Sequence, residues 1–163
     1  MNVVKADVEN CSYGIILYDN VYKDYSPKGK NILTLAISQG YDHWKEYEEE
    51  YLKGKKTAYK KEKEGMAYIL IKRAEKALLP GLSKTNEIME IGFSLTNMRY
   101  TGNYRCAVYG RDQTLDNSMP RRMPITTPIK NLYLARAWTQ PGGGYGGVIG
   151  SGLMCFAEIM KYW

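Results

Sequence analysis

The glycine-rich segment near the end of the sequence restricts the fold more than any other part of the chain. Seven of the sixteen glycines lie between Gly142 and Gly152, after an apolar segment of strand length and before a segment of helical composition. Glycine lets the backbone turn tightly and approach a ligand closely, and the free N–H groups that begin a helix attract anionic or carbonyl oxygens. The segment therefore predicts a strand, a tight turn and a closing helix, with a nucleotide-type cofactor as the first ligand to consider.

The same segment contains the spacing G-x-G-x-x-G at Gly142, Gly144 and Gly147. A dinucleotide fold needs a second parallel strand afterwards and an acidic residue roughly 20 positions later that binds a ribose. Only one helix of chain follows here, so the spacing does not make a Rossmann fingerprint. The alternative interpretation is a tight turn that only lets a helix pack closely on a strand.

Length and composition are typical of one globular domain. The chain has 163 residues, of which 44% are hydrophobic, and this content is ordinary for a protein with a core. Its three cysteines, Cys11, Cys106 and Cys155, are odd in number and widely spaced, which argues against a disulfide framework and against a metal site. No stretch approaches the ~18 to 20 apolar residues of a membrane span. We expect a cytoplasmic protein, and peripheral contact with a membrane stays open.

The single histidine and the net charge admit two further hypotheses. Ser-His-Asp or Cys-His catalysis would depend on His43, which equally fits a helix cap or a surface position. The net charge of +6 and the fifteen tyrosines are compatible with nucleic-acid binding. However, the lysines between Lys45 and Lys63 alternate with glutamates, which is typical of a solvated helical face. We therefore predict no nucleic-acid partner.

Hydrophobic periodicity predicts a mixed α/β (α+β) fold. Two apolar runs, residues 12–18 and 31–38, should pair as antiparallel strands around the turn residues 26–30. Because these runs are almost continuously apolar, we expect them to lie inside a larger mixed sheet with both faces covered. Apolar residues at three- and four-residue steps predict a long central helix from Ala58 to Leu78, which Pro80-Gly81 ends.

The second half of the chain is less regular. Residues 86–96 are interpreted as a further strand, with Gly92 as a bulge. Residues 97–131 form an irregular connection, and a loop of this length is uncommon unless it is functional or covered by another surface. Residues 131–137 are then predicted to form a buried strand, and the closing helix follows from Tyr145 onward.

Several motifs resemble those of the phytoene desaturase family, which includes bacterial phytoene desaturases, carotenoid isomerases and retinol saturases. The resemblance to the C-terminal flavin motif of this family lies in residues 127–135 and 138–145, Gly147 and Ser151-Gly152. Further residues look most like the retinol saturase and carotenoid isomerase branch: Tyr18-Asp19-Asn20, residues 26–30, residues 79–82, residues 99–103 and Tyr109-Gly110. The match covers nearly the whole chain and keeps its order.

The resemblance implies the C-terminal fragment of a two-domain Rossmann-type flavoprotein. The N-terminal half of such a protein, or a separate subunit, would hold the ADP part of FAD. Residues 1–125 would be the end of the substrate-binding domain, and residues 126–163 the returning strand, glycine-rich loop and helix of the FAD-binding domain. The implied activity is FAD-dependent desaturation, saturation or isomerisation of a polyene or another apolar substrate.

Without the other half, we expect the chain to be inactive and to bind no FAD. Surfaces that the missing half would cover should then be exposed, so self-association is also expected. The alternative is a non-enzymatic module that folds alone and binds a partner protein or a lipid.

The resemblance also implies site residues, although no catalytic residue is assigned. Ala135, Arg136 and Ala137 would end the strand near the ribityl and diphosphate groups. Five residues would direct their backbone N–H groups to the pyrimidine oxygen of the flavin, namely Gly144, Tyr145, Gly146, Gly147 and Val148. Arg136 departs from the family, which has glycine or another small residue at this position. Its long cation could pair with the diphosphate or block FAD.

Tyrosines of the irregular connection are candidates for a substrate channel. The candidate residues are Tyr100, Asn103, Tyr104 and Tyr109. Aromatic rings would give such a channel an apolar wall. The alternative is that these tyrosines pack in the domain core or at a domain interface.

Overall fold

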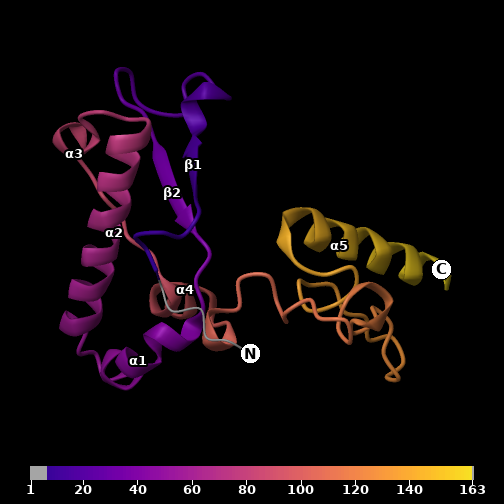
Figure 1. The fold of residues 1–163 in the computed structure, drawn as a ribbon. Coiled ribbons are helices and arrows are strands. Elements are labelled where there is room, and N and C mark those ends of the chain that lie inside the picture. The colour runs from indigo at the N-terminus through magenta and orange to yellow at the C-terminus, as the bar shows by residue number, and fades with distance from the viewer. Residues whose placement is uncertain (1–6, 163) are drawn as a thin grey trace. The chain divides into compact units, whose positions relative to one another are not determined.

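The computed structural model describes residues 7–162, which belong to two compact units that divide between Thr96 and Asn97. The first unit contains an antiparallel hairpin of β1 (Tyr13–Leu17) and β2 (Leu33–Ile37), shown in Figure 1. A short 3-10 turn, η1 (Tyr18–Asn20), follows β1. The predicted pairing of these two strands is therefore confirmed.

The larger mixed sheet is not found among the described residues. β1 and β2 form a two-stranded sheet, and the residues of β1 alternate between half-buried and exposed, with Ile16 among the exposed ones. The expectation that both faces are covered is thus wrong for this chain. A continuous apolar run indicates that a strand can be buried on both faces. It does not show that this chain contains the helices or strands that would cover those faces.

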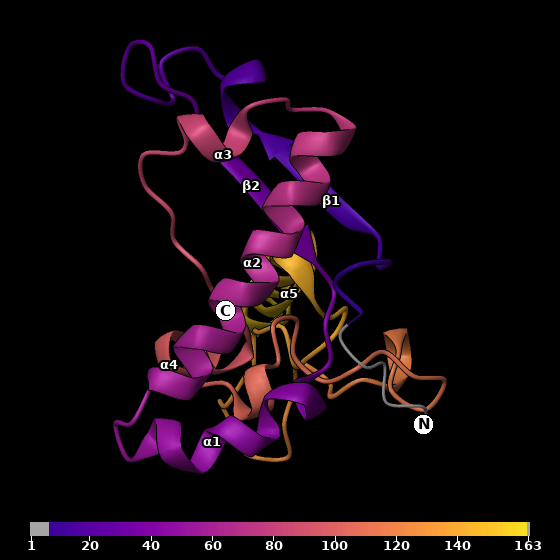
Figure 2. The ribbon, with the colours of Figure 1, turned by 60° about the vertical axis from the view of Figure 1, so that its left-hand side comes forward.

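Most of the remaining regular elements of the first unit are helices. They are η2 (Tyr41–Trp44), α1 (Lys45–Leu52), α2 (Thr57–Ala77) and α3 (Leu82–Thr85). The long central helix is confirmed as α2, which runs beside the hairpin in Figures 1 and 2. Gly81, with a φ of 88°, turns the chain between α2 and α3. This left-handed conformation suits glycine. The last helical residue of α2 is Ala77, three residues before the predicted stop at Pro80-Gly81.

An aromatic cluster forms the core of the first unit. The buried Trp44 packs against Tyr59 and Phe93, with ring centroids 5.2 and 4.8 Å away. The Tyr59 hydroxyl lies 2.8 Å from the Thr96 hydroxyl and accepts the Thr96 backbone N–H. This cluster ties α2 to the segment that follows α3.

The strand predicted at residues 86–96 is wrong. Residues 86–93 form no regular secondary structure and pair with no strand among the described residues, and α4 (Ser94–Thr101) begins inside the predicted range. Ile88 and Met89 are exposed to solvent. The carbonyl of Ile91 accepts a hydrogen bond from Lys63 Nζ. This side-chain donor takes the place of the backbone N–H that a neighbouring strand would provide.

The second unit is mostly irregular and ends in a helix. Its elements are η3 (Tyr104–Cys106), η4 (Met119–Arg121) and α5 (Gly144–Met160). The predicted closing helix is confirmed as α5. The irregular connection predicted at residues 97–131 is confirmed after Thr101, but residues 97–101 belong to α4. The buried strand predicted at residues 131–137 is wrong, because this segment forms only an isolated bridge from Tyr133 to Thr126, and Ala135 and Arg136 are exposed. Among the described residues, the segment belongs to no strand of a sheet.

The fold is therefore mixed helix and strand. The boundary predicted between residues 125 and 126 concerns two domains of a longer flavoprotein and stays a prediction. Within residues 7–162, no helix has both the length and the apolar content needed to cross a bilayer.

Candidate functional site

The glycine-rich loop between Thr139 and α5 is shaped by close backbone contacts. Gly142 and Gly144 have φ angles of 101° and 75°, and these left-handed values suit glycine. A Cβ on Gly143 would lie 2.8 Å from Tyr109 Cβ, and a Cβ on Gly147 would overlap the carbonyl of Gly142. The loop thus folds back on the first turn of α5, which only glycine permits.

The backbone amides at the start of α5 are available to a ligand. Gly143 precedes the helix and provides no side-chain cap. Apart from bonds inside the helix itself, no described acceptor is bonded to the amides of Gly144, Tyr145, Gly146 or Gly147. The start of a helix carries a partial positive charge, so these amides favour anionic or carbonyl oxygens.

A buried polar network holds the glycine-rich loop in place. The hydroxyls of Thr139 and Ser151 lie 2.8 Å apart, and both accept the backbone N–H of Arg136. Arg122 is also buried and donates to the carbonyls of Ala137 and Thr139. These contacts hold together the end of residues 131–137, the glycine-rich loop and α5.

Sequence reasoning missed the roles of Arg122, Thr139 and Ser151. Thr139 and Ser151 belong to the motifs that resemble the flavin motif, but the motifs alone do not show that their hydroxyls meet. Arg122 lies in the irregular connection, where no periodicity marks a residue as buried.

The structure brings the predicted cofactor residues together at this loop. Ala135 and Arg136 are exposed, and Ala137 is half-buried at the end of the extended segment. The other five residues form the beginning of α5, namely Gly144, Tyr145, Gly146, Gly147 and Val148. Their roles in binding a cofactor stay predictions.

Of the four substrate-channel candidates, Tyr109 lies against the glycine-rich loop, since its backbone carbonyl approaches Gly143. The side chains of Tyr100, Tyr104 and Tyr109 are exposed. Asn103 is half-buried, and its backbone N–H donates to the Thr101 hydroxyl. The tyrosines are therefore not part of a core within this chain, and their role in a channel stays a prediction.

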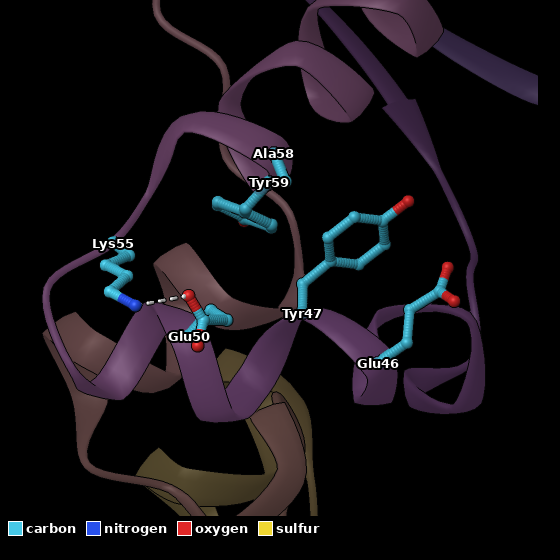
Figure 3. Close-up of a pocket in the computed structure, with 6 residues that line it drawn as sticks. All are labelled: Glu46, Tyr47, Glu50, Lys55, Ala58 and Tyr59. Atoms are coloured by element: carbon cyan, nitrogen blue, oxygen red, sulfur yellow. Dashed lines mark ion pairs between the residues drawn. The ribbon is translucent and has the colours of Figure 1, made fainter.

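The first unit contains a small hollow beside α1 and the start of α2 (Figure 3). It measures about 240 Å³ and is lined by Glu46, Tyr47, Glu50, Lys55, Ala58 and Tyr59. The Glu50 carboxylate pairs with Lys55 Nζ at 3.3 Å. Burial raises the pKa of Tyr47, and the nearby charges of Glu62 and Glu46 raise it further. None of the predicted site residues borders this hollow.

His43 borders a second hollow in the same unit, of about 650 Å³. Its Nε2 lies 3.0 Å from the Glu62 carboxylate, and its ring meets the Trp44 ring edge-on. The described residues that line the hollow include no serine, threonine or cysteine, so none of them is a nucleophile of the kind that Ser-His or Cys-His catalysis uses. Among residues 7–162, no group of three or more His, Cys, Asp or Glu side chains could hold a metal ion.

Comparison with known proteins supports the resemblance seen in the motifs. The chain is 29% identical over 147 residues to the all-trans-retinol 13,14-reductase of Danio rerio. It is 32% identical over 142 residues to the chloroplastic prolycopene isomerase of Arabidopsis thaliana. The chain is a relative of retinol reductases and prolycopene isomerases. The suspected family is thereby confirmed at the level of these two kinds of protein.

The match is extensive for this chain and partial for its relatives. It covers 88% of this chain and 24% of the Danio rerio reductase, and 82% of this chain and 21% of the Arabidopsis thaliana isomerase. The chain thus spans less than a quarter of the length of these relatives. No protein-family model and no solved structure matches it.

Proposed function

We propose that this chain forms the C-terminal part of an FAD-dependent oxidoreductase and closes the flavin site around the reactive ring. The observation that carries the proposal is the glycine-rich loop, which leads into free backbone amides at the start of α5. The similarity to retinol reductases and prolycopene isomerases, at 21% to 24% of their length, supports a role as one part of a larger site.

The residues at the loop fit a flavin ring. A Cβ on Gly144 or Gly146 would meet nothing within 4 Å, so a ligand can approach the backbone on that side. The amides of Gly144 to Gly147 would hold a flavin carbonyl oxygen, and the positive end of α5 would favour negative charge there. When bound, FAD would supply hydride transfer. The chain itself would orient the ring and present these donors to it.

For the substrate, we propose a polyene or another long apolar molecule that is desaturated, saturated or isomerised. The names of the relatives give all-trans-retinol and prolycopene as substrates of those proteins. The rings of Tyr100, Tyr104 and Tyr109 are exposed, and in the complete enzyme they would form part of an apolar channel wall. A location in the cytoplasm, with contact to a membrane surface, stays part of this proposal.

The proposal can be tested in a chimera, in which this chain replaces the matched segment of the Danio rerio reductase. Gly146→Pro removes one backbone donor, and proline is tolerated in the first turn of a helix. Gly146→Ala is the matched control, because it adds a side chain in open space and keeps the donor. We expect Gly146→Pro to weaken FAD binding at least about tenfold, the loss of one charge-assisted hydrogen bond.

Flavin fluorescence titration measures the affinity, and chromatography of reduced all-trans-retinol measures turnover. Equal FAD affinity in the two variants would contradict the proposal. If the folded chimera holds no flavin, and the isolated chain binds lipid vesicles instead, the non-enzymatic module becomes the better account.

A further inference from the structure

Arg122 is a buried cation without an acidic partner. Its residue is 2% exposed, and no carboxylate among residues 7–162 forms an ion pair with it. A buried guanidinium normally pairs with an acid, because removing its charge from water is unfavourable. Its position under the glycine-rich loop therefore needs a physical reason.

Among the described residues, the partners of the guanidinium are all backbone carbonyls. Nη2 donates to the Ala137 carbonyl at 2.7 Å and Nε donates to the Thr139 carbonyl at 3.2 Å. Nη1 donates to the carbonyls of Arg111 and Asn117, at 3.1 and 3.5 Å. The five N–H groups of arginine form a rigid planar fork, so one side chain can join several carbonyls that no strand pairs. Arg122 thereby connects the irregular connection to the segment that enters the loop.

The loop also rests directly on this side chain. A Cβ on Gly142 would lie 2.5 Å from Arg122 Nε and 2.7 Å from Cζ. The Gly142 carbonyl, in turn, lies against Gly147 in the first turn of α5. A displacement of the guanidinium would therefore move Gly142 and, through its carbonyl, the first turn of α5.

The charge of Arg122 adds to the positive end of α5. Two positive groups close together repel each other, and a negatively charged oxygen beside the loop would offset that repulsion.

We propose that Arg122 is the positioning residue of the glycine-rich loop, and that its charge makes the loop select a ligand oxygen that carries negative charge. The identity of that ligand as a reduced, anionic flavin rests on the proposed function. The positioning itself rests only on contacts within this chain.

The positioning is tested by hydrogen exchange of the isolated chain, followed by mass spectrometry of peptides from residues 137–150. In Arg122→Met, amide exchange in the loop should accelerate at least about tenfold, because the carbonyls lose their shared donor. Arg122→Lys should give an intermediate result, since an ammonium group lacks the fork. The matched control is Arg121→Met, which removes an exposed cation from the neighbouring position. Unchanged exchange in Arg122→Met would overturn the proposal.

The charge is tested with a thiol reporter, because a purely structural role would not affect it. In a Tyr145→Cys background, peptide-resolved alkylation across a pH series gives the pKa of the new thiol. We expect this thiol pKa to rise by about half a unit in Arg122→Met, and to change less in Arg122→Lys, which keeps the charge. The same thiol pKa in all three proteins, with the loop still protected, would show that Arg122 is only structural.

A second variant keeps the test decisive if Arg122→Met does not fold. Arg122→Lys retains the charge but lacks the planar fork, so the loop should lose part of its protection while the rest of the second unit stays folded. Protection equal to that of the unchanged chain would overturn the proposal. Neither experiment uses a flavin, so both results stand whether or not the chimera binds FAD.

Discussion

Gly147 and Gly152 both lie on α5, but they differ in the space around their Cα atoms. A Cβ on Gly147 would overlap the Gly142 carbonyl, whereas a Cβ on Gly152 would meet nothing within 4 Å. We expect Gly147→Ala to lower the free energy of unfolding by about 1 to 3 kcal/mol, as overpacking does. Gly152→Ala should raise it by up to ~1 kcal/mol, because alanine favours the helix. Urea denaturation followed by circular dichroism gives both values, and changes of the same sign would contradict the loop geometry.

Asp19 predicts a pH dependence of the hairpin loop. Its carboxylate accepts the backbone N–H of Ile32 at 2.8 Å, and both the N–H and the hydroxyl of Ser26. The Ile32 hydrogen bond is the main cause that lowers the pKa of Asp19 below its ordinary value of 3.8.

Because the pKa of Asp19 is lower in the folded state, its contribution to stability is complete above the ordinary value. That contribution decreases as the pH falls through the lowered pKa. NMR titration should place the Asp19 midpoint below 3.8, and Ser26→Ala should shift the midpoint upward. A midpoint at or above the ordinary value would contradict these contacts.

At the scale of elements, α5 is apolar around most of its circumference. Its exposed apolar side chains, between 42% and 67% exposed, are Val148, Ile149, Leu153, Met154, Phe156 and Met160. A helix of this kind is normally buried on several sides. Its exposure is the physical basis for the proposed self-association, or for contact with the proposed N-terminal half.

We expect the isolated chain to self-associate through α5. Leu153→Glu combined with Phe156→Glu should shift the weight-average mass towards the monomer, because association would then bury two carboxylates. Sedimentation velocity over a concentration series measures this shift. Gln113→Glu, which adds a charge at an exposed site outside α5, is the control. A strictly monomeric unchanged chain at high concentration would contradict the expectation.

Elements that are defined by their own residues could be predicted from the sequence, whereas elements that need partners could not. The periodicity of α2 and the composition of α5 belong to single segments, and the two helices lie close to the predicted ranges. The run at residues 86–96 has strand-like composition but no neighbouring strand among the described residues, and Phe93 packs against Trp44 instead. The same reasoning applies to residues 131–137, which enter the loop with only an isolated bridge.

The candidate site shows the same contrast. The glycines of the loop could be predicted to allow close backbone contacts, because each of them lacks a side chain. The contact of the Arg122 guanidinium with the loop could not be predicted, because Arg122 reaches the carbonyls of Ala137 and Thr139 only after the irregular connection has folded. Such contacts leave no periodic signal in the sequence.

At the scale of the whole molecule, the chain presents one side of the proposed flavin site. The free amides of α5 and the exposed tyrosines would provide contacts for a ring and an apolar substrate, but the nucleotide part of FAD needs further surface. The partial coverage of the relatives, at 21% to 24% of their length, agrees with this division. An isolated half of a cofactor site should bind its cofactor weakly, because most of the contact area is missing.

The most direct test of this account is the flavin content of the purified protein, measured by absorbance in the visible flavin bands after denaturation and compared with the protein concentration. The account predicts no bound flavin in the isolated chain, even after incubation with excess FAD, and close to one FAD per molecule in the chimera with the Danio rerio reductase. A yellow isolated chain that retains flavin through gel filtration, or a folded chimera without flavin, would contradict it.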